Sequence, residues 1–283
     1  MPVRSIVIIG AGELGGAVAR QLAAADIAPG IVLVDDAGRV AEGKALDILQ
    51  AAPVDGYSTH LSGTTDETVV VGADVVVIAD RAATGLEWQD DAGVALVRRI
   101  THLNPSAMLV CAGGRQMDVV ERGVREGGIS RQRLIGTAPE AVRAAVISLT
   151  ALEAGCSPTE ISLTVVGRPP AQMIVPWGDA SIGGRRAVDV LAPPAITRLD
   201  ARLPRLWPPG PMTLASAAAR VLRAAVTRSQ LSLSLFVVAA REGGGDGAVG
   251  MLPVTMEPRG IATLLASTLT GRDRVRLETA LQR

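Results

Sequence analysis

Residues 5–15 read SIVIIGAGELG, an apolar, β-branched run that leads directly into a GxGxxG motif. Such a run predicts a buried strand, and an amphipathic helix pattern follows it. The glycines Gly10, Gly12 and Gly15 permit a tight turn, a close backbone approach to a pyrophosphate, and close packing of the helix on the strand. The stretch therefore predicts the strand, turn and helix that open a dinucleotide-binding domain.

The acid that follows the next apolar run indicates which dinucleotide is bound. Asp35 stands 25 residues after Gly10, at the end of that run. A carboxylate there can accept hydrogen bonds from the adenosine ribose hydroxyls and repels a 2′-phosphate, which favours NAD over NADP. Alternatively, the glycines only allow a tight turn and Asp35 is a solvated residue. The predicted cofactor-binding residues are Gly10, Gly12, Glu13, Leu14, Gly15 and Asp35, with the Glu13 side chain expected to point to solvent.

Apolar, β-branched runs recur through the first half, each before a helical pattern. They cover residues 5–9, 31–34, 74–78 and 107–111. This alternation is typical of a parallel sheet with helices on both faces. We therefore expect an α/β fold, with a Rossmann-type doubly wound parallel sheet in a dinucleotide-binding domain over residues 1–137. A C-terminal α+β domain, of the substrate and oligomerisation type, is expected over residues 138–283.

The second half changes character. A long helix is expected to run to about Ala154 and to end at Gly155, and Ser157 to Glu160 have the capping-box pattern. The further expected elements are a short helix leading into a strand at 161–167, irregular connections around a short helix at 169–211, a helix at about 212–228, antiparallel hairpin material at 231–255 broken by the glycine cluster 243–247, and a closing helix at about 272–282.

Composition excludes several classes of protein. The 283 residues allow two domains, and 28 basic against 28 acidic residues leave no basic stripe for nucleic acid. Apolar runs such as 232–240 fall short of the roughly 18 to 20 residues of a membrane-spanning helix. Cys111 and Cys156 lack metal-ligand spacing, and the chain starts without a signal-peptide pattern. We therefore expect a cytoplasmic protein with no metal site, no nucleic-acid partner and no membrane segment.

Scarce residues limit the chemistry further. Tyr57 and Lys44 are the sole residues of their types, and their spacing does not match a tyrosine and lysine proton relay. The two histidines are His60, in or beside a strand, and His102, on a helix. Both histidines are expected to be structural.

Several segments resemble the NAD-dependent malate/lactate dehydrogenase family, and the likeness covers nearly the whole chain. The matching segments are SIVIIGAGELG, IVLVDD, EGKALDILQAAPVDG, LSGTTD, ADVVVIAD, RLIG, LEAGCSP and WGDASIGG. EGKALDILQAAP and LEAGCS resemble the malate branch more than the lactate branch. The resemblance implies a Rossmann domain, a mixed α/β substrate domain, and dimers or tetramers.

The resemblance also implies a chemistry. In that family hydride passes between the nicotinamide and C2 of a 2-hydroxy acid, while a histidine exchanges the hydroxyl proton. An aspartate orients the histidine, and one arginine binds the substrate carboxylate through two hydrogen bonds. A mobile loop supplies a second arginine, and an asparagine helps to position the substrate.

This chain departs from the family pattern at those positions. The family's GxHGD stretch aligns with GRPPA, so Pro169 takes the place of the histidine. An ungapped alignment from RLIG to LEAG puts Val142 at the aspartate position and Ala145 at the arginine position. An alignment shifted by two residues instead places Glu140 at the aspartate position and Arg143 at the arginine position, with the same three-residue spacing. This alignment needs a two-residue deletion followed by a compensating insertion.

The loops around the cofactor also differ. The family's Asn-Pro turn reads GGR at residues 113–115, and the mobile arginine-rich loop is shortened to residues 81–85. Asp80 and Arg81 bring bulk and charge to a turn where small residues of the family approach the dinucleotide. Joint loss of cooperating acid–base residues costs several powers of ten in rate. Ordinary malate dehydrogenase activity is therefore not expected.

Three hypotheses follow. The first is a catalytically silent family member that still binds NAD(H), as a homo-oligomeric sensor or as the partner of an active paralogue in a mixed oligomer. The second is an NAD-dependent oxidoreductase acting on a 2-hydroxy or 2-oxo acid with a rebuilt active site. Its possible ligand-binding residues are Arg115, Arg168, Glu140 and Arg143, with Glu140 or water handling the proton. The third is a scaffold or interaction protein without cofactor, which Glu13, Asp80 and Arg81 motivate.

Overall fold

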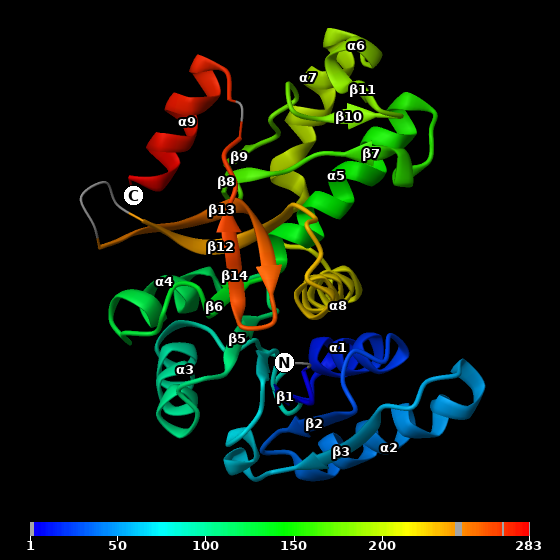
Figure 1. The fold of residues 1–283 in the computed structure, drawn as a ribbon, viewed down its shortest axis with the longest axis vertical. Coiled ribbons are helices and arrows are strands. Elements are labelled where there is room, and N and C mark those ends of the chain that lie inside the picture. Colours follow the sequence, from blue (N-terminus) through cyan, green and yellow to red (C-terminus); the bar gives the residue numbers. More distant parts are fainter. Residues whose placement is uncertain (1–2, 241–244, 268, 283) are drawn as a thin grey trace.

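The computed structural model describes residues 3–240, 245–267 and 269–282. Figure 1 shows two lobes stacked along the long axis, with the first strands and helices of the chain in the lower lobe and most later elements in the upper one. Helix α8 (Pro211–Thr227) belongs to the second half of the chain but lies at the junction, where it contacts α1 (Glu13–Ala24).

The lower lobe is built on parallel strands. They are β1 (Ser5–Ile9), β2 (Gly30–Val34), β3 (His60–Thr64), β4 (Val75–Ile78), β5 (Met108–Cys111) and β6 (Leu134–Gly136). Neighbours pair in the order β3-β2-β1-β4-β5-β6, so the chain reverses its direction across the sheet between β1 and β4. In such sheets ligands bind beside the carboxyl ends of the strands at this switch point. The predicted doubly wound α/β fold and its strands at 5–9, 31–34, 74–78 and 107–111 are confirmed.

Helices cover both faces of this sheet, which is why every residue of β4 and β5 is buried. They are α1, α2 (Gly38–Asp55), α3 (Asp90–Leu103) and α4 (Met117–Arg125), with the 3₁₀ turn η1 (Glu67–Val70). On α1 the residues Leu14, Val18 and Leu22 are buried, as their spacing predicts. The apolar face of α1 is therefore directed to the core, and its first turn remains at the carboxyl edge of the sheet.

The second half begins as predicted. Helix α5 (Ala138–Ala154) ends at Gly155, whose left-handed backbone (φ 65°) caps it. The capping box at Ser157 and Glu160 is present and opens the 3₁₀ turn η2 (Pro158–Glu160).

The prediction of a single strand at 161–167 is wrong. The segment forms two short strands, β7 (Ile161–Ser162) and β8 (Val166–Arg168), which belong to different sheets. Strand β7 pairs with β10 (Ser181–Ile182), whereas β8 pairs with β9 (Gln172–Ile174) and with β13 (Asp246–Glu257). Between them, the Leu163 carbonyl accepts from Arg143 and the Val165 amide donates to Ser234, so side chains satisfy this backbone in place of a ladder.

The proline-rich region is more regular than the expected irregular connections around one short helix. Besides β9 and β10, residues 169–211 form β11 (Arg185–Arg186), α6 (Ala187–Val190), α7 (Pro193–Arg202) and the 3₁₀ turn η3 (Leu203–Leu206). The reason is the position of the prolines: Pro193 and Pro204 lie in first turns, where no helical N–H is lost. Counting prolines alone therefore underestimates the helix content.

The chain closes with helix α8, a β-hairpin and a last helix, as predicted. The hairpin pairs β12 (Leu233–Ala240) with β13, β14 (Gly260–Leu264) adds to it, and α9 (Gly271–Leu281) follows. Of the predicted glycine cluster 243–247, positions 243 and 244 lie outside the described residues. Gly136 of β6 pairs with Phe236 of β12, which continues the sheet from the lower lobe into the upper one. The boundary at residues 137 and 138 falls directly after β6 and stays a prediction.

Among the described residues, no helix is long and apolar enough to cross a membrane. No grouping of three or more His, Cys, Asp or Glu side chains in the described ranges is arranged to hold a metal ion.

Candidate functional site

The glycine loop joins β1 to α1 at the carboxyl edge of the parallel sheet. Gly10 has a φ of 106°, and a Cβ atom there would lie 2.3 Å from the carbonyl oxygen of Asp80. A Cβ at Gly15 would lie 2.0 Å from the carbonyl oxygen of Gly10. These two positions thus require glycine for the tight turn and for packing of the helix on the strand. Lys44 of α2 donates a hydrogen bond from Nζ to the Gly12 carbonyl and holds the loop from the other side.

The first turn of α1 already has an anionic partner. The backbone nitrogen of Gly15 lies 2.8 Å from Asp80 Oδ1, and that of Leu14 lies 3.1 Å from Asp80 Oδ2. The Gly12 amide donates to the Asp80 backbone carbonyl at 3.0 Å. Free N–H groups and the positive end of the helix dipole make this turn an anion site. The buried Asp80 carboxylate occupies the donors that would otherwise meet a phosphate.

Asp35 is also bonded to backbone rather than solvated. It is 7% exposed, and its carboxylate accepts from the amides of Ala11 at 2.8 Å, Ala37 at 2.9 Å and Ala82 at 2.9 Å. A carboxylate offers about four lone-pair positions, so one remains after these three bonds. The side chain of Glu13, by contrast, is exposed, as expected.

A short hairpin, residues 80–88, covers the groove between these groups. Asp80 and Glu87 form a bridge, Arg81 N donates to the Leu86 carbonyl at 2.9 Å, and Gly85 lies at the bend. The Arg81 guanidinium stacks 4.0 Å from the centre of the Trp88 ring. We call this segment the 80–88 hairpin.

The other end of the 80–88 hairpin is fixed on the turn after β5. Glu87 accepts from the amides of Gly114 at 3.0 Å and Arg115 at 2.7 Å. A Cβ at Gly113 would lie 2.2 Å from Glu87 Oε2, so the glycines of this turn make room for the carboxylate. Burial raises the pKa of Glu87, and the two amide donors oppose the rise. Gln116 donates a hydrogen bond to the Trp88 carbonyl at 2.9 Å, which is a second connection between this turn and the hairpin.

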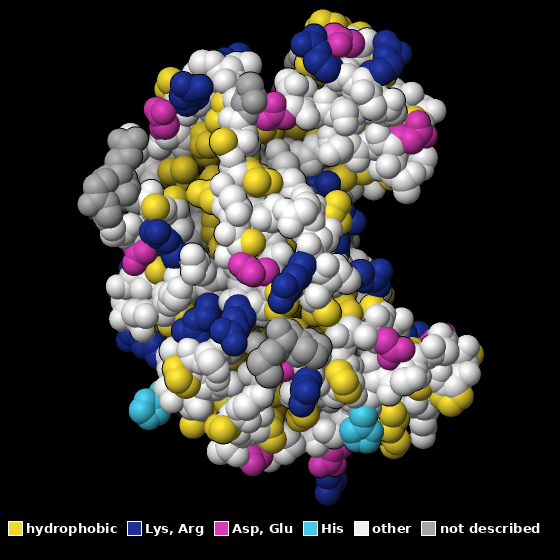
Figure 2. Space-filling view, in the orientation of Figure 1, with side chains coloured by type: hydrophobic (Ala, Val, Ile, Leu, Met, Phe, Trp, Pro, Cys, Tyr) yellow, Lys and Arg dark blue, Asp and Glu magenta, His cyan; other side chains and the backbone are white. Residues whose placement is uncertain are grey.

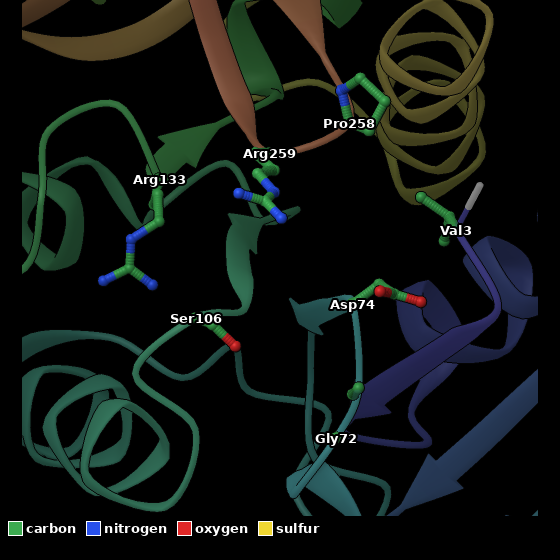
Figure 3. Close-up of a pocket in the computed structure, with 8 residues that line it drawn as sticks. Val3, Gly72, Asp74, Ser106, Arg133, Pro258 and Arg259 are labelled. Atoms are coloured by element: carbon green, nitrogen blue, oxygen red, sulfur yellow. The ribbon is translucent and has the colours of Figure 1, made fainter. Parts of the chain in front are cut away.

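The space left in this groove is small. The cavity lined by Gly10, Asp35, Arg81 and Trp88 has a volume of about 10 Å³, which is at most the room for one water molecule. By contrast, the cavity at the opposite edge of the same sheet, where Asp74 and Ser106 precede β4 and β5, has about 360 Å³ (Figure 3).

The side chains predicted at the family's catalytic positions lie in three different settings. Val142, predicted at the aspartate position, is fully buried in the core, and Ala145, predicted at the arginine position, is half-buried on α5. Pro169, predicted at the histidine position, follows β8. His60 begins β3 and His102 lies in the last turn of α3, and both are exposed.

The acids and arginines of the rebuilt-site hypothesis do not gather in one place. Glu140 and Arg143 form a buried ion pair at 2.7 Å, which Arg220 of α8 joins at 2.9 Å. Burial raises the pKa of Glu140, which the two arginines and the Ser234 amide counteract. Arg168 pairs with Glu121 of α4 at 3.3 Å instead, whereas the Arg115 side chain is exposed.

The Glu140 pair borders an open hollow. Cavities of about 440 Å³ and 520 Å³ lie along α5 and α8, and Arg220 lines both. Figure 2 shows the molecule hollowed between its two lobes on this side, with Lys and Arg side chains on the wall.

The sequence pattern points to Asp80 and Arg81 but not to Glu87, Trp88 and Gln116, which belong to the same structure. The available signal was the shortened loop. A segment that turns at Thr84 and Gly85 so soon after β4 must fold back toward the strand, which places the residue after the bend against Asp80.

Comparison with known proteins assigns the family. Residues 4–85 match the family model described as lactate/malate dehydrogenase, NAD binding domain. The malate dehydrogenase of Thioalkalivibrio sulfidiphilus is 33% identical over 208 residues, which cover 71% of this chain and 68% of that protein. The chain belongs to the lactate/malate dehydrogenase family. NAD, predicted as the cofactor, is confirmed as the cofactor of the domain type that residues 4–85 form.

Other members of the family agree over longer or shorter stretches. The malate dehydrogenase of Cytophaga hutchinsonii is 26% identical over an alignment of 298 positions, gaps included, that covers 97% of this chain and 94% of that protein. The match to the malate dehydrogenase of Thermomicrobium roseum, 32% identical, spans 55% of its length. Among solved structures, the lactate dehydrogenase of Cryptosporidium parvum, complexed with lactic acid and nicotinamide adenine dinucleotide, has a TM-score of 0.85 at 20% identity and covers 99% of this chain and 95% of that one. That likeness supports the fold.

The backbone of the glycine loop fits a dinucleotide, but part of the groove is already filled by the chain itself. The loop supplies amide donors at a helix N-terminus and has no side chains in the way at Gly10 and Gly15. The donors of Leu14 and Gly15 are taken by Asp80, and the remaining cavity is about 10 Å³. In this conformation the 80–88 hairpin therefore occupies amide donors and space at the loop where the family binds its dinucleotide.

Proposed function

We propose that the chain is a catalytically silent member of the lactate/malate dehydrogenase family that recognises NAD(H) without turning over malate or lactate. The observation that carries this proposal is the set of side chains at the aligned catalytic positions: Pro169, Val142 and Ala145. None of them can donate or accept a proton or bind a carboxylate. Without a group that titrates near neutrality, the alcohol proton has no acceptor in the site.

The candidate replacements are engaged elsewhere. Glu140 accepts from Arg143, Arg220 and the Ser234 amide, which leaves this carboxylate as an internal ion-pair partner. Arg168 is bound to Glu121. These contacts favour the hypothesis of a catalytically silent protein over that of an oxidoreductase with a rebuilt active site that acts on 2-hydroxy or 2-oxo acids.

Recognition of NAD(H) rests on the glycine loop and on Asp35. The three glycines have the backbone geometry that close approach of a pyrophosphate needs. Asp35 lies beside the loop, where a carboxylate accepts from ribose hydroxyls and repels the 2′-phosphate of NADP.

The proposal includes a cytoplasmic, oligomeric protein. Cys111 and Cys156 are both free thiols, in keeping with a reducing compartment. Exposed apolar side chains on three helices, Leu46, Val54, Leu152 and Met212, are available for association into a dimer or tetramer, or into a mixed oligomer with an active paralogue.

A second candidate function is favoured by the occupied loop. If Asp80 holds the donors of Leu14 and Gly15 permanently, the chain is an interaction protein that has lost its cofactor. In that case no dinucleotide binds even at high concentration.

Two measurements on the purified full chain test the proposal. The first follows NADH absorbance with oxaloacetate or pyruvate, and with malate or lactate in the reverse direction. We expect no turnover above about 10⁻³ s⁻¹, against about 1 to 10³ s⁻¹ for ordinary enzymes. Turnover in the ordinary range with any of these acids overturns the proposal that the chain is catalytically silent.

The second measurement is thermal unfolding with millimolar NADH, with NADPH as the matched control. Ligand at about a hundred times its dissociation constant adds roughly 2.7 kcal/mol, which moves the midpoint by several degrees. We expect NADH to raise the midpoint more than NADPH does, because Asp35 disfavours the extra phosphate. No shift with either nucleotide supports the second candidate function.

A further inference from the structure

We propose that the 80–88 hairpin is a built-in competitor of the dinucleotide: the Asp80 carboxylate takes the place of a phosphate at the start of α1, and NAD(H) binds only when this hairpin withdraws. The inference rests on the proposed recognition of NAD(H) and adds a regulatory element to it.

The contacts of Asp80 are those of a bound anion. Its two oxygens accept from two successive amides at a helix N-terminus, Leu14 at 3.1 Å and Gly15 at 2.8 Å. A carboxylate is planar and a phosphate group is tetrahedral, but both carry anionic oxygens that accept hydrogen bonds from such donors. A Cβ at Gly12 would lie 2.3 Å from Asp80 Oδ2, so the side chain rests in the space that this glycine leaves open. The two anions therefore compete for one set of donors.

The hairpin covers the groove from end to end. At one end Asp35, the predicted ribose acceptor, receives the Ala82 amide at 2.9 Å. At the other end Glu87 is bonded to the turn at Gly114 and Arg115, directly after β5. A dinucleotide that lies along the carboxyl edge from β2 to β5 therefore meets the hairpin along its whole length.

The closed hairpin also carries unsatisfied groups. Arg81 Nε and Trp88 Nε1 are buried and have no hydrogen-bond partner among the described residues. Buried donors without partners destabilise the conformation that holds them. The hairpin is thus stabilised by its two carboxylates and destabilised by its two buried donors, which makes withdrawal accessible. A ligand that binds only the withdrawn state has an affinity reduced by the fraction of molecules in that state.

Removal of the competing carboxylate tests the inference. NADH fluorescence titration compares the full-length wild type with Asp80→Ala and Asp80→Asn. We expect Asp80→Ala to bind NADH at least about tenfold more tightly, with Asp80→Asn in between, because the amide keeps one acceptor oxygen.

Asp74 offers a matched control. Its carboxylate also accepts from two successive amides, Arg4 at 2.6 Å and Ser5 at 3.2 Å, but at the opposite edge of the same sheet, beside the cavity in Figure 3. Asp74→Asn should keep the NADH affinity within about twofold of the wild type.

Each outcome of the titration has a distinct meaning. Equal or weaker binding by folded Asp80→Ala, with measurable binding by the wild type, overturns the competitor and leaves NAD(H) recognition intact. Absence of binding by both proteins at millimolar NADH overturns the competitor and the recognition together.

A measurement on the wild type covers the case in which the variants do not fold. Hydrogen exchange at the highest attainable NADH concentration should become faster at residues 81–88 and slower at residues 11–16, because the hairpin leaves the loop that the nucleotide enters. Slower exchange in both segments means that the hairpin closes over the nucleotide, and this overturns the inference.

Discussion

The Asp80 carboxylate lies 2.8 Å from the backbone nitrogen of Gly15, although the two residues are 65 positions apart in the chain. The contact connects the end of β4 with the start of α1, across the switch point of the sheet. In this arrangement a side chain of the protein completes the anion site that the glycine loop creates. The same contact fastens the loop to the residues after β4 and fills part of the groove.

Asp80 is expected to stabilise the protein in the manner of a helix cap. Asp80→Ala leaves the Leu14 and Gly15 amides without their acceptor, and loss of a capping side chain costs about 0.5 to 2 kcal/mol. Urea unfolding should therefore show a lower midpoint for this variant. Glu13→Ala, which removes an exposed acid of the same turn, should stay within about 0.5 kcal/mol. Equal stability of wild type and Asp80→Ala contradicts the contact.

The buried Glu87 carboxyl is expected to make stability depend on pH. Burial raises its pKa in the folded state above the ordinary value. The folded protein therefore binds this proton more tightly than the unfolded chain, and the contribution of Glu87 to the free energy of unfolding is largest below the ordinary glutamate pKa of about 4.3. That contribution is lost as the pH rises through the folded-state pKa.

Comparison with Glu87→Gln isolates this effect, because other titrating groups are common to both proteins. The free energy of unfolding, measured in urea from mildly acidic to neutral pH, should decline for the wild type relative to the variant as the pH increases. A relative gain for the wild type with increasing pH means that the folded state favours the charged form, against the assigned direction.

The Glu140–Arg143 pair is expected to be a structural requirement. Both side chains are buried, so Arg143→Ala leaves the carboxylate with Arg220 and one amide, and breaking a buried ion pair from one side costs about 3 to 5 kcal/mol. Arg186→Ala serves as the control, because Arg186 and Asp189 form an exposed pair at the same three-residue spacing and such pairs contribute about 0 to 1 kcal/mol. Similar losses in the two variants, measured in urea, would falsify the structural role.

An aspartate at position 142, the predicted place of the family aspartate, is expected to destabilise the chain. Val142 is fully buried, and Val142→Asp places a charge in the core without a partner histidine. A loss of about 3 kcal/mol or more is expected, whereas Val142→Ala, which only leaves a cavity, should lose less. A stable Val142→Asp protein means that the helix position is open to a catalytic pair after all.

Much of the fold could be predicted from local signals. The β1 run and the glycine loop carry their own periodicity and turn chemistry, and the cap at Gly155 follows from one residue. The prediction of one strand at 161–167 was wrong because the chain is interrupted between β7 and β8. There, Arg143 and Ser234 from distant elements form hydrogen bonds with the backbone. Local pattern cannot register such contacts.

The candidate site shows the same limit. The turn at the glycines and the position of Asp35 beside it were predictable, since the motif and its spacing are local; their role in binding the cofactor stays a prediction. The occupied groove was not, because it results from Asp80 and Glu87 meeting the loops after β1 and β5 in space. The sequence indicated only that bulk and charge stand at positions 80 and 81; the partners of those side chains required the tertiary structure.

An assay of NADH oxidation by Asp80→Ala with oxaloacetate and pyruvate, after its NADH affinity has been measured, tests whether the chain binds NADH without catalysis. Under the proposed competition, Asp80→Ala frees two amide donors for the dinucleotide but leaves Pro169 at the predicted histidine position. We expect tight NADH binding together with turnover below about 10⁻³ s⁻¹. Turnover of about 1 s⁻¹ or more with either acid would contradict a catalytically silent chain and would show a working site behind the hairpin.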